Sequence, residues 1–196
     1  MKIVLATRNK KKVEEIRRVL QDSSVTLLSL ADFPDCPEVI EDGETFLANA
    51  EKKAAEVARF TGHHALADDS GLVVDGLAGA PGIYSARYAG PDATDEENLN
   101  KVLQGLSGQS PGRRAARFMC VISLVSPAGT RQSFSGSVEG RICESPAGSN
   151  GFGYDPVFIP EGHEKTFAQM SAQEKDALSH RGRALAAFAH GWKNTN

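Results

Sequence analysis

The sequence predicts an α/β fold built on a mixed β-sheet with flanking helices. In the N-terminal part of the chain, short apolar runs alternate with segments of helical periodicity, a pattern typical of parallel βαβ units. The middle of the chain instead carries two longer runs, 117–126 and 131–138, on either side of Pro127-Ala128-Gly129-Thr130. Such a pair predicts a β-hairpin, so parallel and antiparallel strands are expected in one sheet.

Two strands and two helices are expected in the first third of the chain. In order, they are a strand at 2–6, a helix at 9–20, a strand at 25–30, an acidic loop at 31–43 and a helix at 45–61. The first helix places Val13, Ile16 and Leu20 on one face. The second is expected to stop at Gly62, because glycine commonly ends helices.

The rest of the chain predicts shorter elements. Strand pieces are expected at 65–67 and 72–74, on either side of a turn at Asp68-Asp69-Ser70-Gly71. A glycine-rich turn region follows at 76–82 and a glycine-rich loop at 147–154, and 108–112 is the most linker-like stretch. Two Ser/Thr-x-x-Glu capping boxes, Thr94 with Glu97 and Ser171 with Glu174, open a helix to about 106 and one continuous helix to about 192.

Composition narrows the class of protein. The chain has 196 residues, 40% of them hydrophobic and 24% charged, which suits one globular domain, 1–196. Its 22 Lys and Arg against 25 Asp and Glu give a net charge of −3, which disfavours a nucleic-acid partner. The sequence predicts neither a membrane span nor a signal peptide. Cys36, Cys120 and Cys143 are too far apart for a zinc site or a disulfide framework, so the cytoplasm is expected.

The turn into the first helix carries a run of polar and cationic residues: Thr7, Arg8, Asn9, Lys10, Lys11 and Lys12. A helix N-terminus offers unpaired N–H groups and a partial positive charge, which suit phosphate. Lysines in a first turn oppose the helix dipole, and a bound polyanion would reverse that penalty. The alternative is a solvated cationic face paired locally with Glu14 and Glu15. The glycines of a Walker P-loop are missing.

Two cations interrupt apolar helix faces. Lys53 falls within a stripe made by Phe46, Ala50, Val57 and Phe60. Arg181 falls within a stripe made by Leu178, Leu185, Phe188 and Trp192, with Lys175 at its border. A ligand anion, a structural ion pair or, for Lys53, a snorkelling side chain would explain them. His180 points away from Arg181 on a continuous helix, unless the helix bends at Gly182 or starts later.

Acidic and aromatic segments supply further candidate binding residues. Asp68 and Asp69 alternate on an extended chain, so one can face a site while the other braces a turn. With the acids of 38–42 they suit Mg²⁺, although a capped turn is the simpler alternative. The segment Gly151-Phe152-Gly153-Tyr154-Asp155-Pro156 offers rings that could stack on a base or pack in the core. No zincin or Gly-x-Ser-x-Gly motif is present, so attack by water is the simplest chemistry.

These motifs together resemble the inosine triphosphate pyrophosphatase family, which includes the dITP/XTP pyrophosphatases. The matching stretches, in the family's order, are Thr7-x-Asn9-x-x-Lys12, Thr45-Phe46 with Asn49 and Lys53, Ala67 to Leu72, Gly79 to Tyr88, Gly151 to Pro156, and Glu174-Lys175 with Ser179-His180-Arg181. The chain departs from many relatives at Arg8, where they carry glycine.

The resemblance implies Mg²⁺-dependent hydrolysis of ITP, dITP and XTP to the monophosphate and pyrophosphate, which cleanses the nucleotide pool. It also implies a homodimer and an elongated fold with two lobes around a central cleft. It assigns Asp69 as general base and metal ligand, and Glu41 as second metal ligand. Thr7 to Lys12 and Lys53 would hold the triphosphate. The sugar and base would meet Ser70, Phe152, Gly153, Tyr154, Asp155, Lys175, His180 and Arg181.

Two other functions remain compatible with the residues. One is a related pyrophosphatase acting on modified pyrimidine triphosphates, which a substrate panel would separate from the purine enzyme. The other is a nucleotide- or RNA-binding module that uses the cations of 10–18, which would bind with steep salt dependence and hydrolyse nothing. The acidic net charge and the Asp68-Asp69 pair disfavour the second.

Overall fold

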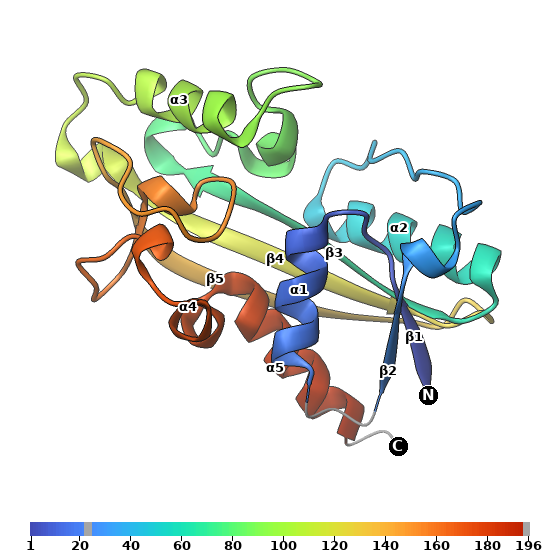
Figure 1. Ribbon diagram of the computed structural model, residues 1–196. Helices are drawn as coiled ribbons and strands as arrows, with labels where there is room; N and C mark the ends of the chain where they lie inside the picture. The colour runs from blue at the N-terminus through green and yellow to red at the C-terminus, as the bar shows by residue number, and fades with distance from the viewer. Residues whose placement is uncertain (22–24, 194–196) are drawn as a thin grey trace. The chain divides into compact units, whose positions relative to one another are not determined.

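The computed structural model describes residues 1–21 and 25–193 (Figure 1), and its strands form one six-stranded sheet in the order β2-β1-β3-β4-β5-β6. The strands are β1 (Lys2–Leu5), β2 (Thr26–Ser29), β3 (His64–Val74), β4 (Ala115–Val125), β5 (Arg131–Ile142) and β6 (Phe158–Pro160). The helices are α1 (Lys10–Val19), α2 (Phe46–Thr61), α3 (Asp95–Gly105), α4 (Ala172–Leu178) and α5 (His180–Lys193). β1 pairs in parallel with β2 and β3, whereas β5 and β6 are antiparallel, which confirms the mixed sheet.

The chain forms two compact units. Unit 1 comprises Met1–Asp69, Cys120–Gly136 and Arg181–Asn196. Unit 2 comprises Ser70–Met119 and Ser137–His180. Strands β3, β4 and β5 each supply residues to both units.

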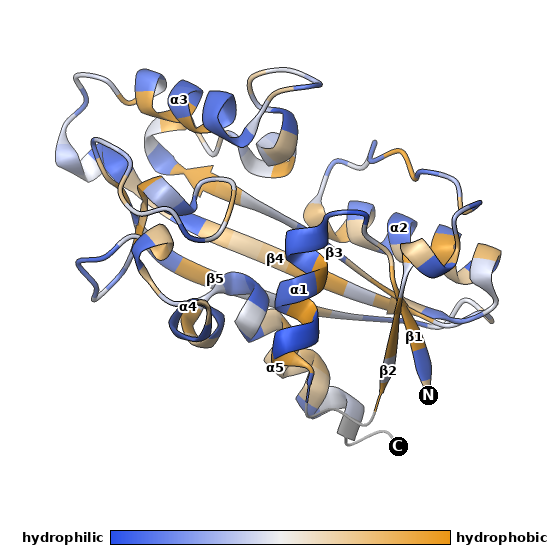
Figure 2. Ribbon diagram, in the orientation of Figure 1, coloured by the Kyte–Doolittle hydropathy of each residue, from blue (hydrophilic) through white to orange (hydrophobic). Residues whose placement is uncertain are grey.

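In unit 1, helices cover both faces of the sheet. Alternate side chains of β1 point to opposite faces. Ile3 and Leu5 pack in a cluster with α1 and α5, whereas Val4 packs in a cluster with α2. Figure 1 shows the same arrangement of α1, α5 and α2 around β1. In Figure 2, β1 and β2 are mostly hydrophobic in colour, while α1 shows hydrophilic turns.

Unit 2 has its own hydrophobic core. Phe118 of β4, Phe158 of β6 and Phe167 pack together in it, with ring centroids 4.7 to 6.1 Å apart. Leu99 and Val102 of α3 close the same cluster. The loops of unit 2 are therefore anchored to a packed aromatic core.

Local signals place several helix ends correctly. The side chain of Asn9 accepts from the backbone N–H groups of Lys11 and Lys12 and so caps α1. Gly62 ends α2 with φ of 67°, a conformation that favours glycine. Both predicted capping boxes are present, at α3 and α4.

Three expectations were wrong. Residues 68–71 lie inside the continuous strand β3, so the predicted turn is absent there. The single C-terminal helix is broken at Ser179, whose backbone is extended, and the break falls before Gly182. Phe60, placed in the buried stripe of α2, is 48% exposed. Within the described residues, every helix is too short or too polar to span a membrane.

Candidate functional site

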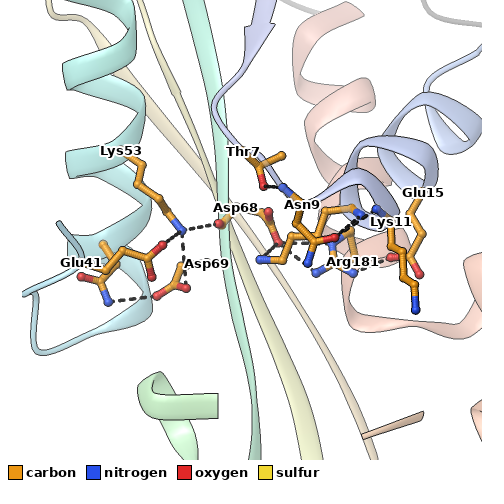
Figure 3. A network of polar contacts seen from close by, with 11 residues as sticks. Thr7, Asn9, Lys11, Glu15, Glu41, Lys53, Asp68, Asp69 and Arg181 are labelled. Atoms are coloured by element: carbon orange, nitrogen blue, oxygen red, sulfur yellow. Dashed lines mark hydrogen bonds and ion pairs between the residues drawn. The ribbon is translucent and has the colours of Figure 1, made fainter. Parts of the chain in front are cut away.

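Strand β3 presents Asp68 and Asp69 to opposite sides of the sheet in unit 1. Leu66 belongs to the cluster with α1 and α5, so Asp68, two residues later, points to that side. Ala67 belongs to the cluster with α2, so Asp69 points there. Figure 3 shows Asp69 beside Lys53 and Glu41, and Asp68 toward Arg181. The alternation predicted from the sequence is therefore confirmed, in a strand and not in a turn.

Lys53 connects three acceptors on the α2 side. Its ammonium donates to Glu41 Oε1 at 2.9 Å and to the backbone oxygen of Asp68 at 2.7 Å. Asp69 Oδ1 lies 3.6 Å from the same nitrogen. Burial alone would lower the pKa of Lys53, but the carboxylates of Asp69, Asp68 and Glu41 raise it overall. The lysine therefore stays charged, and the sequence alternative of a structural ion pair describes this arrangement.

Asp69 is buried in a mixed electrostatic environment. Burial raises the pKa of its carboxyl, and the nearby charge of Glu41 raises it further. Lys53, Lys12 and the hydrogen bond from Asn49 act in the opposite direction, without reversing the shift. A carboxylate with a raised pKa is a stronger base than a solvated aspartate, so Asp69 suits proton abstraction.

Asp68 forms a buried ion cluster on the opposite side of β3. The Nε and Nη2 groups of Arg181 donate to Asp68 Oδ2 at 3.2 and 3.0 Å, and its Nη1 donates to Glu15 Oε2 at 2.5 Å. Lys12 Nζ lies 3.1 Å from Asp68 Oδ2. Burial would raise the pKa of Asp68, but Lys12, Arg181 and Lys53 hold it well below its usual range. This cluster matches the structural ion pair considered for Arg181.

The turn before α1 is organised by its own side chains. The hydroxyl of Thr7 accepts from the backbone N–H of Asn9, and Asn9 caps the helix. Arg8 donates to the backbone oxygen of Cys36 at 2.6 Å, which ties the turn to the acidic loop. Lys10 and Lys11 lie on the exposed surface. The predicted phosphate-binding segment thus has an ordered helix N-terminus flanked by exposed cations.

In unit 2, the aromatic loop is fixed from several directions. Lys175 donates to Asp155 Oδ2 at 2.5 Å, and the same oxygen accepts from the backbone N–H of Phe152. The ammonium of Lys175 lies 4.9 Å from the centre of the Phe152 ring, a cation–π contact. The hydroxyl of Tyr154 donates to the backbone oxygen of Ser85. Phe152 is half-buried, whereas Tyr154 is buried and packs in the core.

The remaining predicted residues of unit 2 lie on β3 and α5. His180 is buried and stacks on Phe118, with ring centroids 4.6 Å apart and planes inclined by 9°. The break at Ser179 removes the continuous-helix geometry that had pointed His180 away from its neighbours. Ser70 is half-buried at the start of the unit 2 part of β3. The structure thus brings together Phe152, Asp155 and Lys175 in unit 2, and Glu41, Lys53 and Asp69 in unit 1.

Comparison with known proteins identifies the family. The profile of the Ham1 family matches residues 3–191. This chain belongs to the Ham1 family. A dITP/XTP pyrophosphatase of Geobacter sulfurreducens is 53% identical over 194 residues, covering 98% of both chains. One of Syntrophobacter fumaroxidans is 55% identical over 183 residues, covering 93% of this chain and 78% of the relative.

Solved Ham1 structures agree with the fold. A HAM1 protein from Coxiella burnetii is 41% identical and superposes with a TM-score of 0.91 over the whole of both chains. A structure named nucleoside-triphosphatase / dITP/XTP pyrophosphatase, from Mycobacterium abscessus, is 47% identical with a TM-score of 0.77, covering 96% of this chain and 97% of that one. The α/β class predicted from the sequence is therefore confirmed.

The Ham1 resemblance implies a divalent metal, and the donor set near Asp69 fits one. Glu41 and Asp69 approach the same ammonium, and the charge of Glu41 is felt in the pKa of Asp69. Mg²⁺ usually takes one or two carboxylates and fills its remaining positions with water and substrate phosphates. No group of three or more acidic, His or Cys side chains arranged for a metal occurs in the described part of the chain. Two carboxylates still satisfy what Mg²⁺ needs from a protein.

Three polar residues of this Ham1 chain make contacts that were not predicted from the sequence. Glu15, considered from the sequence only as a local partner of the cations on α1, is also a buried partner of Arg181. Asp95 accepts from the backbone N–H of Gly153 at 2.8 Å and so supports the aromatic loop. Asn49 contacts Asp69. A signal for Asn49 was available, because it lies one helical turn before Lys53 on the same buried face of α2.

Proposed function

We propose that this Ham1 chain hydrolyses the α–β phosphoanhydride bond of ITP, dITP and XTP with Mg²⁺, releasing the nucleoside monophosphate and pyrophosphate. Its relatives named dITP/XTP pyrophosphatases support the class of enzyme, a nucleoside-triphosphate pyrophosphatase. The observation that carries the proposal is the buried carboxylate of Asp69, with a raised pKa, beside Glu41 and Lys53.

In this proposal, Asp69 accepts the proton of the water that attacks the α-phosphorus. Its raised pKa increases its basicity. Lys53 and the cations of 7–12 hold the triphosphate and offset its negative charge. Glu41 and Asp69 would hold Mg²⁺, whose positive charge would offset the negative charge that develops on the leaving pyrophosphate.

The base of the nucleotide is assigned to residues of unit 2. Phe152 supplies a stacking ring, and Lys175 lies over that ring while it is held by Asp155. Within unit 2, Lys175 and His180 offer mainly donors, which suit the C6 oxygen of hypoxanthine and xanthine and oppose the C6 amino group of adenine. A direct contact of Arg181 with the base stays a prediction, because its guanidinium is held by Asp68 and Glu15.

The resemblance also supports three wider assignments. We propose that residues 1–196 act as one functional unit, that the enzyme is a homodimer, and that it works in the cytoplasm, where nucleoside triphosphates are used. Size-exclusion chromatography with light scattering tests the dimer, since a monomer at micromolar concentration would contradict it.

A nucleotide panel with and without Mg²⁺ tests the proposed function. We expect ITP, dITP and XTP to yield monophosphate and pyrophosphate only with Mg²⁺, and ATP to be hydrolysed with kcat/KM lower by about 10⁴-fold. Products are identified by ³¹P NMR. Release of orthophosphate and diphosphate would refute attack at the α-phosphorus. Preference for modified pyrimidine triphosphates would support the related pyrimidine enzyme instead.

Phe152→Ala tests the assignment of the base. We expect KM for ITP to rise about tenfold, since stacking on an aromatic ring contributes about 1–3 kcal/mol per base. The value of kcat should stay within about threefold of wild type, because the reacting phosphorus is not contacted by this ring. Phe60→Ala is the control, as Phe60 is an exposed aromatic residue in unit 1. An unchanged KM in Phe152→Ala would exclude stacking on this ring.

A further inference from the structure

Asn49 bridges two segments that carry acidic residues. Its side chain is fully buried on α2. The Nδ2 amide donates to Asp69 Oδ2 at 3.1 Å, and Oδ1 accepts from the backbone N–H of Gly43 at 2.8 Å. Gly43 lies two residues after Glu41, so this carboxamide connects the loop of Glu41 to the strand of Asp69.

The chemistry of the two partners requires a side chain that both accepts and donates a hydrogen bond, and the amide of Asn49 does so. A backbone N–H can only donate and an ionised carboxylate can only accept, so the group between Gly43 and Asp69 must accept at one end and donate at the other. This also fixes which end of the Asn49 side chain is oxygen. An aspartate here could accept from Gly43, but it would face Asp69 with a second carboxylate.

Gly43 brings the loop directly against α2. A Cβ atom at position 43 would lie 2.7 Å from Asn49 Oδ1 and 2.9 Å from the Cβ of Ala48, distances that real side chains do not tolerate. The glycine is therefore required by space. Any side chain at position 43 must push the loop, and Glu41 with it, away from the helix.

Asn49 and Lys53 act on the same two segments from successive turns of α2. Lys53 contacts Glu41 and Asp69, whereas Asn49 contacts Gly43 and Asp69. Glu41 and Asp69 are like charges and repel each other, and a lysine cation alone has no directional preference that would fix their separation. The neutral amide adds hydrogen bonds of defined geometry.

We propose that Asn49 is a positioning residue of the pyrophosphatase, which together with Gly43 sets the separation of the Glu41 and Asp69 carboxylates and the orientation of Asp69. The inference rests on the proposed function. Asn49 touches neither phosphate nor water in this role. It acts by holding two metal-binding oxygens where one cation can reach both of them.

The experiment compares Asn49→Ala and Gly43→Ala with a matched control, Asn98→Ala. Asn98 of α3 is also a buried asparagine that uses both ends of its amide, accepting from Ala89 N at 2.7 Å and donating to Ala86 O at 3.2 Å. No carboxylate takes part in either bond. The control therefore removes the same chemical group and a similar share of stability, but leaves the acidic pair intact.

Two readouts separate positioning from stability. Binding of Mn²⁺ to nucleotide-free protein is measured by electron paramagnetic resonance, and kcat and KM are measured with ITP and Mg²⁺. For Asn49→Ala and Gly43→Ala we expect the Kd for Mn²⁺ to rise about fivefold or more, and kcat to fall about 10- to 100-fold with KM within threefold. For Asn98→Ala, both quantities should stay within about twofold of wild type although the melting temperature falls.

The outcomes decide between the alternatives. If Asn49→Ala matches Asn98→Ala in Mn²⁺ affinity and kcat, Asn49 is only structural and the inference is overturned. If Asn49→Ala does not fold, Gly43→Ala decides the question, and wild-type Mn²⁺ affinity in that variant overturns the inference. The double variant that combines Asn49→Ala and Gly43→Ala tests whether the two residues form one bridge. If its Mn²⁺ affinity and kcat are no lower than those of the more affected single variant, one shared bridge is supported, whereas additive losses contradict it. A wild-type protein that binds Mn²⁺ but leaves ITP intact rejects the proposed function and not the bridge.

Discussion

Asp69→Asn should lower kcat for ITP by about 10³-fold while KM changes little, since a positioned general base contributes about 10²- to 10⁴-fold. The substitution keeps the shape of the side chain and removes its ability to take a proton from water. It also removes one of the two carboxylates proposed to bind Mg²⁺, which adds to the loss. Steady-state kinetics and fluorescence titration with a non-hydrolysable ITP analogue separate turnover from binding.

The same variant should fold at least as stably as wild type when both are free of metal. The pKa of Asp69 is raised by burial and by Glu41, so ionisation of this carboxyl opposes folding above pH 4. The folded protein binds the proton of Asp69 more tightly than the unfolded chain does. The stability that this proton contributes is therefore lost as the pH rises from the pKa of the unfolded chain through the pKa of the folded protein. A neutral amide removes that cost, and the melting temperature at pH 7 should be unchanged or higher.

A matched control is Asp75→Asn. Asp75 follows the same strand but is exposed and pairs with Arg117 at 3.2 Å. Its loss should leave kcat within about twofold of wild type, since exposed pairs contribute little. Near-normal turnover in Asp69→Asn would remove this residue from the roles of base and metal ligand. A strongly reduced melting temperature would instead make it a structural residue.

Helices α1 and α2 could be predicted because their signals are local. The caps at Asn9 and Gly62 are encoded within one turn of the helix they bound. The position of Lys53 on a buried face also follows from periodicity alone. The nature of its partners does not, because Glu41 and Asp69 lie 12 and 16 residues away along the chain.

The continuity of β3 could not be predicted from local sequence, because the partners of its two acidic residues lie far away along the chain. Asp-Asp-Ser-Gly has strong local preference for a turn. It is accommodated in a strand because Asp68 meets Arg181, 113 residues away, and Asp69 meets side chains of α2. The role of Glu15 could not be predicted for the same reason, because its partner Arg181 lies 166 residues further along the chain. Nothing local distinguishes Glu15 from Glu14. Long-range pairing here overrides local propensity.

The break at Ser179 has a similar origin. Neither glycine nor proline occupies the position, so the sequence shows no breaker there. Its extended backbone begins a new helix in which His180 stacks on Phe118 and Arg181 reaches Asp68 and Glu15. These contacts lie outside any local window. A sequence pattern therefore identified the residues but not their geometry.

Arg181→Met should destabilise the protein by about 3–5 kcal/mol, because it leaves the buried carboxylates of Asp68 and Glu15 without the guanidinium that pairs them. The side chains of Arg181, Asp68 and Glu15 are 3%, 0% and 9% exposed. The family resemblance places Arg181 at the sugar and base, whereas the buried cluster predicts that its loss lowers stability first. Thermal and urea denaturation measure the effect, expected as a fall in melting temperature of about 6 °C or more.

The control is Arg131→Met, which breaks an ion pair in the same unit. Arg131 is 55% exposed at the side chain and donates to Glu51 at 2.9 Å. Exposed pairs contribute about 0–1 kcal/mol, so this variant should melt within about 3 °C of wild type. The contrast between the two arginines isolates burial as the cause. Equal effects would show that the cluster around Asp68 is no stronger than a surface pair.

The pH dependence of Arg181→Met gives an independent check. Lys12 and Arg181 hold the pKa of Asp68 well below its unfolded value, so this carboxylate stabilises the fold above pH 4 and its contribution is lost as pH falls further. Without Arg181 the pKa rises, and Asp68 can become neutral by binding a proton in mild acid. The stability difference between wild type and variant should therefore shrink from pH 7 to pH 3. A variant that melts like wild type at pH 7 but binds ITP much more weakly would instead assign Arg181 to the nucleotide, and the ion cluster would be a resting state that substrate displaces.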